Sequence, residues 1–192
     1  MKMKLRASFL TIALISSTSV MAAPVQWGST GHWYEYFDTL VTATEAVTLA
    51  QASTFSGMHG YLATITSSYE NWFVANDVAS GSTAFIGGSD AGDEGNWTWR
   101  AGPETGQSLT YTNWASGEPN NNNDEDYILT NWGIGFWNDM GVGPLFTVKF
   151  GYVVEYGDTL LSPVPEPETY AMLLAGLGLL GFMAPRRKET VL

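Results

Sequence analysis

The sequence predicts an α+β domain with two helices and mostly antiparallel strands. Two capping-box patterns, a Ser or Thr followed three residues later by Glu, precede apolar stretches in the first half of the chain. Runs in which aromatic or β-branched residues alternate with polar ones lie mostly in the second half. Between residues 101 and 125, Gly, Pro, Ser and Asn dominate, as is typical of a long loop. Early helices followed by strands indicate an α+β fold.

Both helices have a defined start. Thr42 with Glu45 predicts a helix over roughly residues 43–53, and Ser67 with Glu70 predicts one over roughly residues 68–79. The alternation pattern predicts strands at residues 32–37, 61–65, 83–88, 96–100, 126–130, 136–140 and 149–156.

Composition narrows the function classes. Hydrophobic residues make up 45% of the chain, which excludes general disorder. There is no cysteine, so disulfides, thiolate nucleophiles and Cys-ligated zinc are excluded. The net charge of −11 disfavours nucleic acid as a partner and suits divalent cations, although net negative charge also serves solubility alone.

The first segment is a targeting signal. Residues 1–22 combine a basic start, an apolar stretch over residues 9–15 and small residues at the end, which predicts a secretory signal peptide. The apolar stretch is too short for a retained membrane anchor.

The last segment, residues 159–192, has three parts in order. Pro165-Glu166-Pro167 precedes the charge-free run 171–184, and a basic cluster follows at residues 186–188. The G-x-G-x-x-G match at residues 176–181 follows no strand and is rejected as a dinucleotide site.

The order of a Pro-Glu-Pro motif, a charge-free run and a basic cluster resembles the PEP-CTERM sorting signal. The resemblance implies an exosortase-type processing enzyme, membrane attachment through the C-terminal helix before processing, and an inner-membrane intermediate. The final location would be the cell surface or extracellular matrix of a Gram-negative bacterium that makes exopolysaccharide. Hydropathy alone equally allows an ordinary anchor.

Residues 25–158 form the single remaining domain. "GYLATITSSYENWFV", "FIGGSDAGDEGNWTW", "YTNWASGEPNN", "EDY", "FWND" and "YVVEY" occur there in this order. Together they resemble a C-type lectin-like domain, with EPN and WND as the sugar-site motifs. The family usually carries two disulfides, and this chain departs from that pattern. Ala50, Tyr127 and Val154 stand at cysteine positions, so we expect apolar packing in place of the covalent links.

The residues around the asparagine run predict a main calcium site. Calcium binds six to eight oxygen ligands. Pro119 permits a cis bond that aims its two neighbours at one point. The five predicted ligands, which would also bind carbohydrate, are Glu118, Asn120 and Glu125 on the long loop and Asn138 and Asp139 on a nearby strand. The alternative to a calcium site is a solvated surface loop that binds no ion.

The resemblance also implies an auxiliary calcium site that orders the long loop. Its predicted ligands are Asp90, Glu94, Asn121, Glu125 and Asp126.

Three functions compete. The first is calcium-dependent binding of a glycan or exopolysaccharide, and the order Glu118-Pro119-Asn120 implies mannose-type sugars by resemblance. The second is a structural or protein-binding domain of the cell surface or biofilm. The third is a glycosidase with Glu118 and Glu125 as its two carboxylates. Ligated carboxylates are poor general acids, so we expect a protein that is not an enzyme.

Overall fold

The first helix forms where its capping residues predict it in the computed structural model, which describes residues 23–142 and 148–160. Helix α1 (Ala43–Ala52) has Thr42 as its N-cap. Thr42 Oγ1 accepts a hydrogen bond from the Glu45 amide at 3.3 Å, and Glu45 Oε2 accepts one from the Thr42 amide at 2.8 Å. The capping box is therefore complete and fixes the start of α1.

The second helix changes its winding after five residues. Helix α2 (Ser68–Trp72) is capped by Ser67, whose Oγ accepts from the Glu70 amide at 3.2 Å. It continues as the π-helical segment η1 (Phe73–Val78). The Glu70 carboxylate turns inward, where Oε1 accepts from the Tyr34 hydroxyl at 2.6 Å. The predicted segment 68–79 is therefore helical, but only its first part is α-helix.

The described strands form one nine-stranded mixed sheet. The order along its main path is β1-β2-β9-β5-β7-β8, with β4 also beside β9, β3 beside β4, and β6 beside β5. Every pairing is antiparallel except that of β5 with β9. The strands are β1 (Val25–Gln26), β2 (Trp33–Val41), β3 (Thr54–Phe55), β4 (Met58–Leu62), β5 (Ala84–Ser89), β6 (Thr98–Trp99), β7 (Tyr127–Thr130), β8 (Asn138–Met140) and β9 (Phe150–Leu160).

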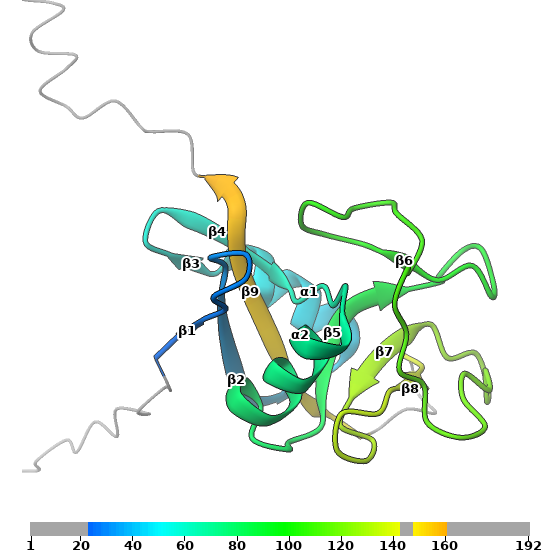
Figure 1. The fold of residues 1–192 in the computed structure, drawn as a ribbon. Coiled ribbons are helices and arrows are strands. Elements are labelled where there is room, and N and C mark those ends of the chain that lie inside the picture. The colour runs from blue at the N-terminus through cyan, green and yellow to red at the C-terminus, as the bar shows by residue number, and fades with distance from the viewer. Residues whose placement is uncertain (1–22, 143–147, 161–192) are drawn as a thin grey trace, which may run out of the picture.

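Strand β9 lies at the centre of this arrangement. Strand β2 runs along one of its edges. The other edge is shared, because residues 154–156 pair with β4 and residues 151–152 pair with β5. Figure 1 shows the consequence: β2 and β9 lie side by side on the left, and β7, β8 and the long loop before them lie on the right.

Each face of the sheet buries its own hydrophobic cluster. Neighbouring residues of a strand point to opposite faces. Accordingly, Ile128 and Val153 belong to one cluster, whereas Leu129 and Val154 belong to the other. The first cluster includes residues of η1, and the second includes the buried alanines of α1. The helices therefore pack on opposite faces of one sheet, and each buries its apolar side there.

Two of the residues expected at cysteine positions lie in one buried apolar cluster. Ala50 of α1 and Val154 of β9 lie in the same buried cluster. Gly60 of β4 packs between them, since a Cβ atom added there would lie 2.7 Å from both the Ala50 carbonyl oxygen and Val154 Cγ1. This close packing is consistent with the expectation that apolar residues take the place of a covalent link.

Two buried carboxylates account for one boundary that sequence reasoning misplaced. The strand expected at residues 61–65 is observed at residues 58–62. Beyond it, the Thr64 amide donates to Glu155 Oε2 at 2.9 Å and the Thr66 amide donates to Glu70 Oε2 at 2.7 Å. The Ala63 amide still donates to the Val153 carbonyl oxygen of β9 at 3.0 Å, but the Thr64 and Thr66 amides bond to side chains, so backbone pairing does not continue beyond Ala63. The strands predicted at residues 96–100 and 136–140 are also shorter in the structure than predicted. Strand β9 runs to Leu160, which is past the predicted domain end at residue 158.

The predicted signal peptide, residues 1–22, and residues 161–192 of the predicted sorting segment lie outside the described residues. Within residues 23–142 and 148–160, no helix has the length and hydropathy needed to span a membrane.

Candidate metal centre

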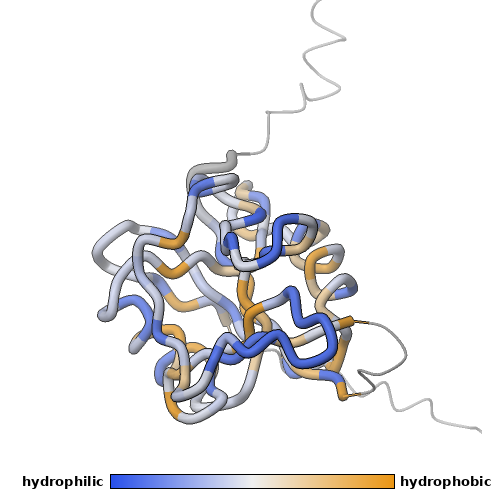
Figure 2. The backbone as a smooth tube through the Cα atoms, turned by 90° about the vertical axis from the view of Figure 1, so that its right-hand side faces the viewer, coloured by the Kyte–Doolittle hydropathy of each residue, from blue (hydrophilic) through white to orange (hydrophobic). Residues whose placement is uncertain are grey.

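The predicted main-site residues lie on one loop and one strand. The loop between β6 and β7 carries Glu118, Asn120 and Glu125, and β8 carries Asn138 and Asp139. Figure 2 views the domain from the side on which this loop lies, and a long hydrophilic stretch crosses that face.

Asp139 fixes the loop to the sheet. Its side chain is fully buried. Oδ1 accepts from the Asn120 amide at 3.2 Å, and Oδ2 accepts from the Asn121 amide at 2.7 Å. Because both bonds join a charged acceptor to backbone donors, they hold the loop against β8 more firmly than neutral bonds would.

The asparagine run forms an ordered turn. The Asn122 amide donates to Asn120 Oδ1 at 2.9 Å and to Glu125 Oε2 at 3.1 Å. The Glu125 amide donates to Asn121 Oδ1 at 2.8 Å. Asn121 and Asn123 adopt positive φ values of 48° and 66°, which asparagine tolerates better than most residues. The described geometry therefore differs from that of a loosely solvated loop.

Three carboxylates of this cluster influence one another. Burial, followed by the close Asp139 carboxylate, raises the pKa of Glu118. Burial is also the largest cause that raises the pKa of Glu125, and the charges of Asp139 and Glu118 add to it, against a bond from the Asn122 amide. The cluster therefore concentrates negative charge. No cationic side chain is among the causes of the pKa shifts of Glu118 and Glu125.

The chain's own atoms leave this cluster incomplete. Among the described residues, Glu118 Oε2 is buried and has no hydrogen-bond partner. A buried carboxylate oxygen without a partner is costly unless a cation or a donor meets it. The Glu118–Pro119 bond is cis, as predicted. The donor set, oxygen atoms from carboxylates and amides, is the one that calcium prefers. The residues present therefore fit a calcium ion.

The position of the two ligands on β8 depends on the residue before them. Trp137 is fully buried, and its Nε1 donates to Asn71 Oδ1 of α2 at 2.7 Å. Its ring contacts Trp99, Tyr111 and Trp114 edge-on, at centroid distances of 6.3, 5.7 and 5.7 Å. The core thus fixes the residue that immediately precedes Asn138.

A second acidic group joins the end of the loop between β6 and β7, next to Glu125, to the loop between β5 and β6. Carboxylate oxygens of Glu94, Asp124 and Asp126 all lie within 4.8 Å of one another. Glu94 is exposed, and slight desolvation, followed by the charge of Asp90, raises its pKa. Asp90 is buried, and among the described residues its Oδ1 has no hydrogen-bond partner.

Sequence reasoning placed three of these four acids and missed Asp124. Asp90, Glu94 and Asp126 were predicted as auxiliary ligands, whereas the Asn121 and Glu125 side chains make their described bonds within the main cluster. Asp124 has a φ of 73°, and this turn brings it to Glu94. Its membership of the acidic triplet 124–126 was the only sequence signal for it.

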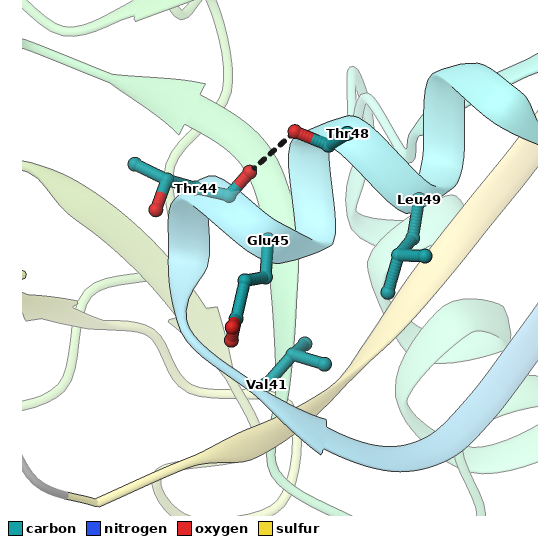
Figure 3. Close-up of a pocket in the computed structure, with 5 residues that line it drawn as sticks. All are labelled: Val41, Thr44, Glu45, Thr48 and Leu49. Carbon is teal, nitrogen blue, oxygen red and sulfur yellow. Dashed lines mark hydrogen bonds between the residues drawn. The ribbon is translucent and has the colours of Figure 1, made fainter.

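A cavity elsewhere on the domain contains none of the predicted ligands. It has a volume of about 440 Å³ and is lined by Val41, Thr44, Glu45, Thr48 and Leu49 (Figure 3). Thr48 Oγ1 already donates to the Thr44 carbonyl oxygen at 3.0 Å, and Glu45 caps α1 and pairs with Lys149 at 3.2 Å. Its polar groups are therefore engaged in holding the helix.

Comparison with known proteins identifies related domains. Residues 45–141 match the family described as "Lectin C-type domain", and residues 163–188 match the "PEP-CTERM protein-sorting motif". The chain is 38% identical over 155 residues to Halomucin of Haloquadratum walsbyi, a match that covers 73% of this chain and 2% of Halomucin. It is 33% identical over 125 residues to the alpha-N-acetylgalactosamine-specific lectin of Patiria pectinifera, covering 60% of this chain and 71% of that lectin.

A solved structure has the same fold. The C-type lectin CEL-I from Cucumaria echinata superposes with a TM-score of 0.57 at 28% sequence identity, covering 70% of this chain and 96% of CEL-I.

Proposed function

Because the chain belongs to the C-type lectin domain family, we propose that it is an exported lectin that binds glycans through calcium held by its long loop. Family membership supports carbohydrate binding in general and places the chain among proteins that are not enzymes. The prediction of a non-enzyme is thereby confirmed. Calcium dependence, the choice of sugar and the location are the parts that we propose.

The observation that carries the calcium proposal is the unpartnered Glu118 Oε2. It lies in a cluster where the Asp139 carboxylate and burial both raise the pKa of Glu118. A cation relieves both the lost hydration and the repulsion. The five ligands that we propose are Glu118, Asn120, Glu125, Asn138 and Asp139.

The same side chains supply complementary groups for a sugar. A calcium ion accepts six to eight oxygen ligands, so five protein residues leave positions for two sugar hydroxyls. A carboxylate only accepts hydrogen bonds, whereas an amide NH₂ donates them. Glu118 and Asn120 form one such pair, and Glu125 and Asn138 form a second. Each hydroxyl then donates to an acid and accepts from an amide.

We expect the protein to be retained on mannose-agarose in calcium and to be eluted by mannose, glucose, fucose or N-acetylglucosamine. The reason is the order of the acid and amide in Glu118-Pro119-Asn120, which by family resemblance goes with equatorial 3- and 4-hydroxyls. The measurement is competitive elution, with a chelator as the control for calcium dependence. Elution by galactose or N-acetylgalactosamine, but not by mannose, would refute the sugar assignment. Calcium binding without any retention would favour the structural or protein-binding alternative.

We also propose an auxiliary calcium site at the second acidic group. Asp90, Glu94 and Asp126 are its ligands as predicted, with Asp124 added by the geometry. Asn121 and Glu125, the other two predicted ligands, remain part of the proposal, and their side chains make their described hydrogen bonds within the main cluster. A calcium titration that gives two ions per chain supports this site, and a single ion would remove it.

The match at residues 163–188 supports sorting by an exosortase in a Gram-negative host. We expect mass spectrometry of protein isolated from the host to show that residues 1–22 and the segment after the Pro-Glu-Pro motif are missing. The sorting signal is removed by its processing enzyme, whereas an ordinary anchor is retained. A full-length tail on surface-located protein would contradict the sorting proposal.

A further inference from the structure

Four large apolar side chains are exposed on two segments of the domain. Trp72, at the end of α2, is 59% exposed. Trp132, Ile134 and Phe136, in the loop between β7 and β8, are 50%, 73% and 48% exposed. We call these four residues the apolar patch. Single exposed apolar side chains are ordinary on a soluble domain, whereas a cluster of them indicates a contact surface.

A direct hydrogen bond places the two segments against each other. Asn71 Nδ2 donates to the Gly135 carbonyl oxygen at 2.9 Å. A Cβ atom added to Gly135 would lie only 3.2 Å from the same nitrogen. Trp72 follows Asn71 in the chain. Ile134 and Phe136 stand on either side of Gly135. The exposed side chains of the apolar patch therefore surround one point of contact between α2 and the loop.

The loop that carries most of the apolar patch is held in place by buried polar groups. Asn131 Nδ2 donates to the carbonyl oxygens of Ala75 and Ser82 at 3.1 and 3.0 Å. The Gly135 amide donates to Asn131 Oδ1 at 2.7 Å. A surface that is already ordered loses little conformational entropy when a partner binds to it.

The two segments expose no charged side chain. Glu70 is the one Asp, Glu, Lys or Arg in residues 68–72 and 131–137, and it is buried, with Oε1 accepting from the Tyr34 hydroxyl. The chain as a whole has a net charge of −11, and the described residues contain Arg100 and Lys149 as their Arg and Lys side chains. Two copies therefore repel each other over most of their surface and least at the apolar patch.

The same charges make an anionic lipid surface a poorer occupant. Such a surface attracts proteins through clusters of Lys and Arg beside the apolar contact. Neither Arg100 nor Lys149 lies in the segments of the apolar patch, and the acidic domain around it is repelled by anionic headgroups.

The size of the apolar patch matches one side of a protein–protein interface. With about half to three-quarters of each side chain exposed, the four residues together present about 450 Å². A standard interface buries about 800 Å² per partner, of which about 57%, or about 450 Å², is non-polar. The cores of such interfaces are also depleted of charge and enriched in Trp and Phe.

We propose that two copies of the chain associate through the apolar patch, in a twofold dimer in which each patch packs on its equivalent. A twofold contact requires a self-complementary surface, and an uncharged apolar patch meets its own copy without opposing like charges. The dimer goes beyond the proposed lectin function, because it needs neither calcium nor sugar to form. It would carry two of the proposed sugar sites on one particle, which raises avidity for a repeating glycan.

Sedimentation equilibrium of the exported protein, in calcium and in chelator, tests the dimer. The double variant Trp72→Ser with Ile134→Ser removes one exposed side chain from each segment. The matched control is Leu40→Ser with Val148→Ser, which removes two apolar side chains that are 62% and 60% exposed on β2 and just before β9. Far-UV circular dichroism verifies that each variant is folded. We expect the wild type and the control to be dimers at micromolar concentrations, and the dimer dissociation constant of the double variant to be at least about a hundredfold higher.

Four results would overturn the proposal. They are a monomeric wild type, a dimer that the double variant leaves intact, a dimer that the control abolishes, and a dimer that forms only in calcium. Flotation with phosphatidylcholine vesicles identifies the other occupant. A monomeric wild type that floats with the vesicles, when the double variant does not, would assign the apolar patch to a lipid surface. Failure of the calcium proposal leaves this test unaffected, because the dimer is expected equally in chelator.

Discussion

Replacing Glu118 with glutamine is expected to stabilise the calcium-free domain and to remove most of the stability that calcium adds. The carboxylate is partly buried, its Oε2 has no partner among the described residues, and Asp139 lies close to it. Glutamine removes the charge and keeps the shape. A ligand that binds only the folded state adds about 2.7 kcal/mol to the free energy of unfolding at a hundredfold excess over Kd, and a variant that binds weakly loses this gain. Thermal melts in calcium and in chelator measure both effects.

The pH dependence of the same melts provides an independent check. A carboxyl whose pKa is raised in the folded state lowers stability at pH values above that pKa, and the penalty is relieved as the pH falls through it. The pKa values of Glu118 and Glu125 are both raised, chiefly by burial. The calcium-free wild type should therefore gain stability as the pH falls from about 7 toward about 5. The Glu118→Gln variant should gain less.

The control for this experiment is Asp38→Asn, which removes one exposed acid on β2, outside the loop. It should leave the calcium-dependent shift in melting temperature unchanged. A Glu118→Gln variant that loses stability in chelator, or that keeps the full calcium-dependent shift, would show that Glu118 is not a calcium ligand.

Replacing Trp137 with alanine is expected to lower the free energy of unfolding by about 3–5 kcal/mol, because it removes a fully buried ring. It also leaves Asn71 Oδ1 without the bond that Nε1 donates. Trp137→Phe keeps an aromatic ring but loses this bond, so its loss should be smaller, about 1–3 kcal/mol. Chemical denaturation gives both values.

Trp137→Ala should also weaken calcium binding, since Trp137 immediately precedes Asn138 and Asp139. Tyr69→Ala is the matched control, because this aromatic side chain is 79% exposed. Its effect on stability should lie within about 0.5 kcal/mol. Calcium affinity equal to the wild type in a folded Trp137→Ala variant would show that the core does not position the ligands on β8.

The parts of the fold that the sequence predicted correctly are those with local causes. The Thr42–Glu45 pair defines the start of α1 because both of its hydrogen bonds lie within four residues. The Ser67–Glu70 pair predicted a helix start but not the inward turn of the Glu70 side chain, which depends on Tyr34, a residue 36 positions away. The pattern of apolar residues contains no signal for the change to π-helix at Phe73.

The candidate site shows the same division. Motif order predicted the main-site residues on segments that the structure shows to be the loop and β8. The role of Asp124 depends on backbone φ values in a turn of asparagines and acids, where many conformations have similar energies. The burial of Glu155 was also not predictable from its strand, because its partners His32 and Thr64 lie 123 and 91 positions away.

The central position of β9 determines when the domain can fold. Strand β9 is the last described element, and it pairs with β2, β4 and β5, which are all made earlier. A chain that emerges from its N-terminus therefore holds three unpaired strand edges until residues 150–160 are free. Pairings across more than a hundred residues form slowly, and exposed edges invite association with other chains. The sorting motif begins at residue 163, so the signal for processing emerges directly after the strand that completes the sheet.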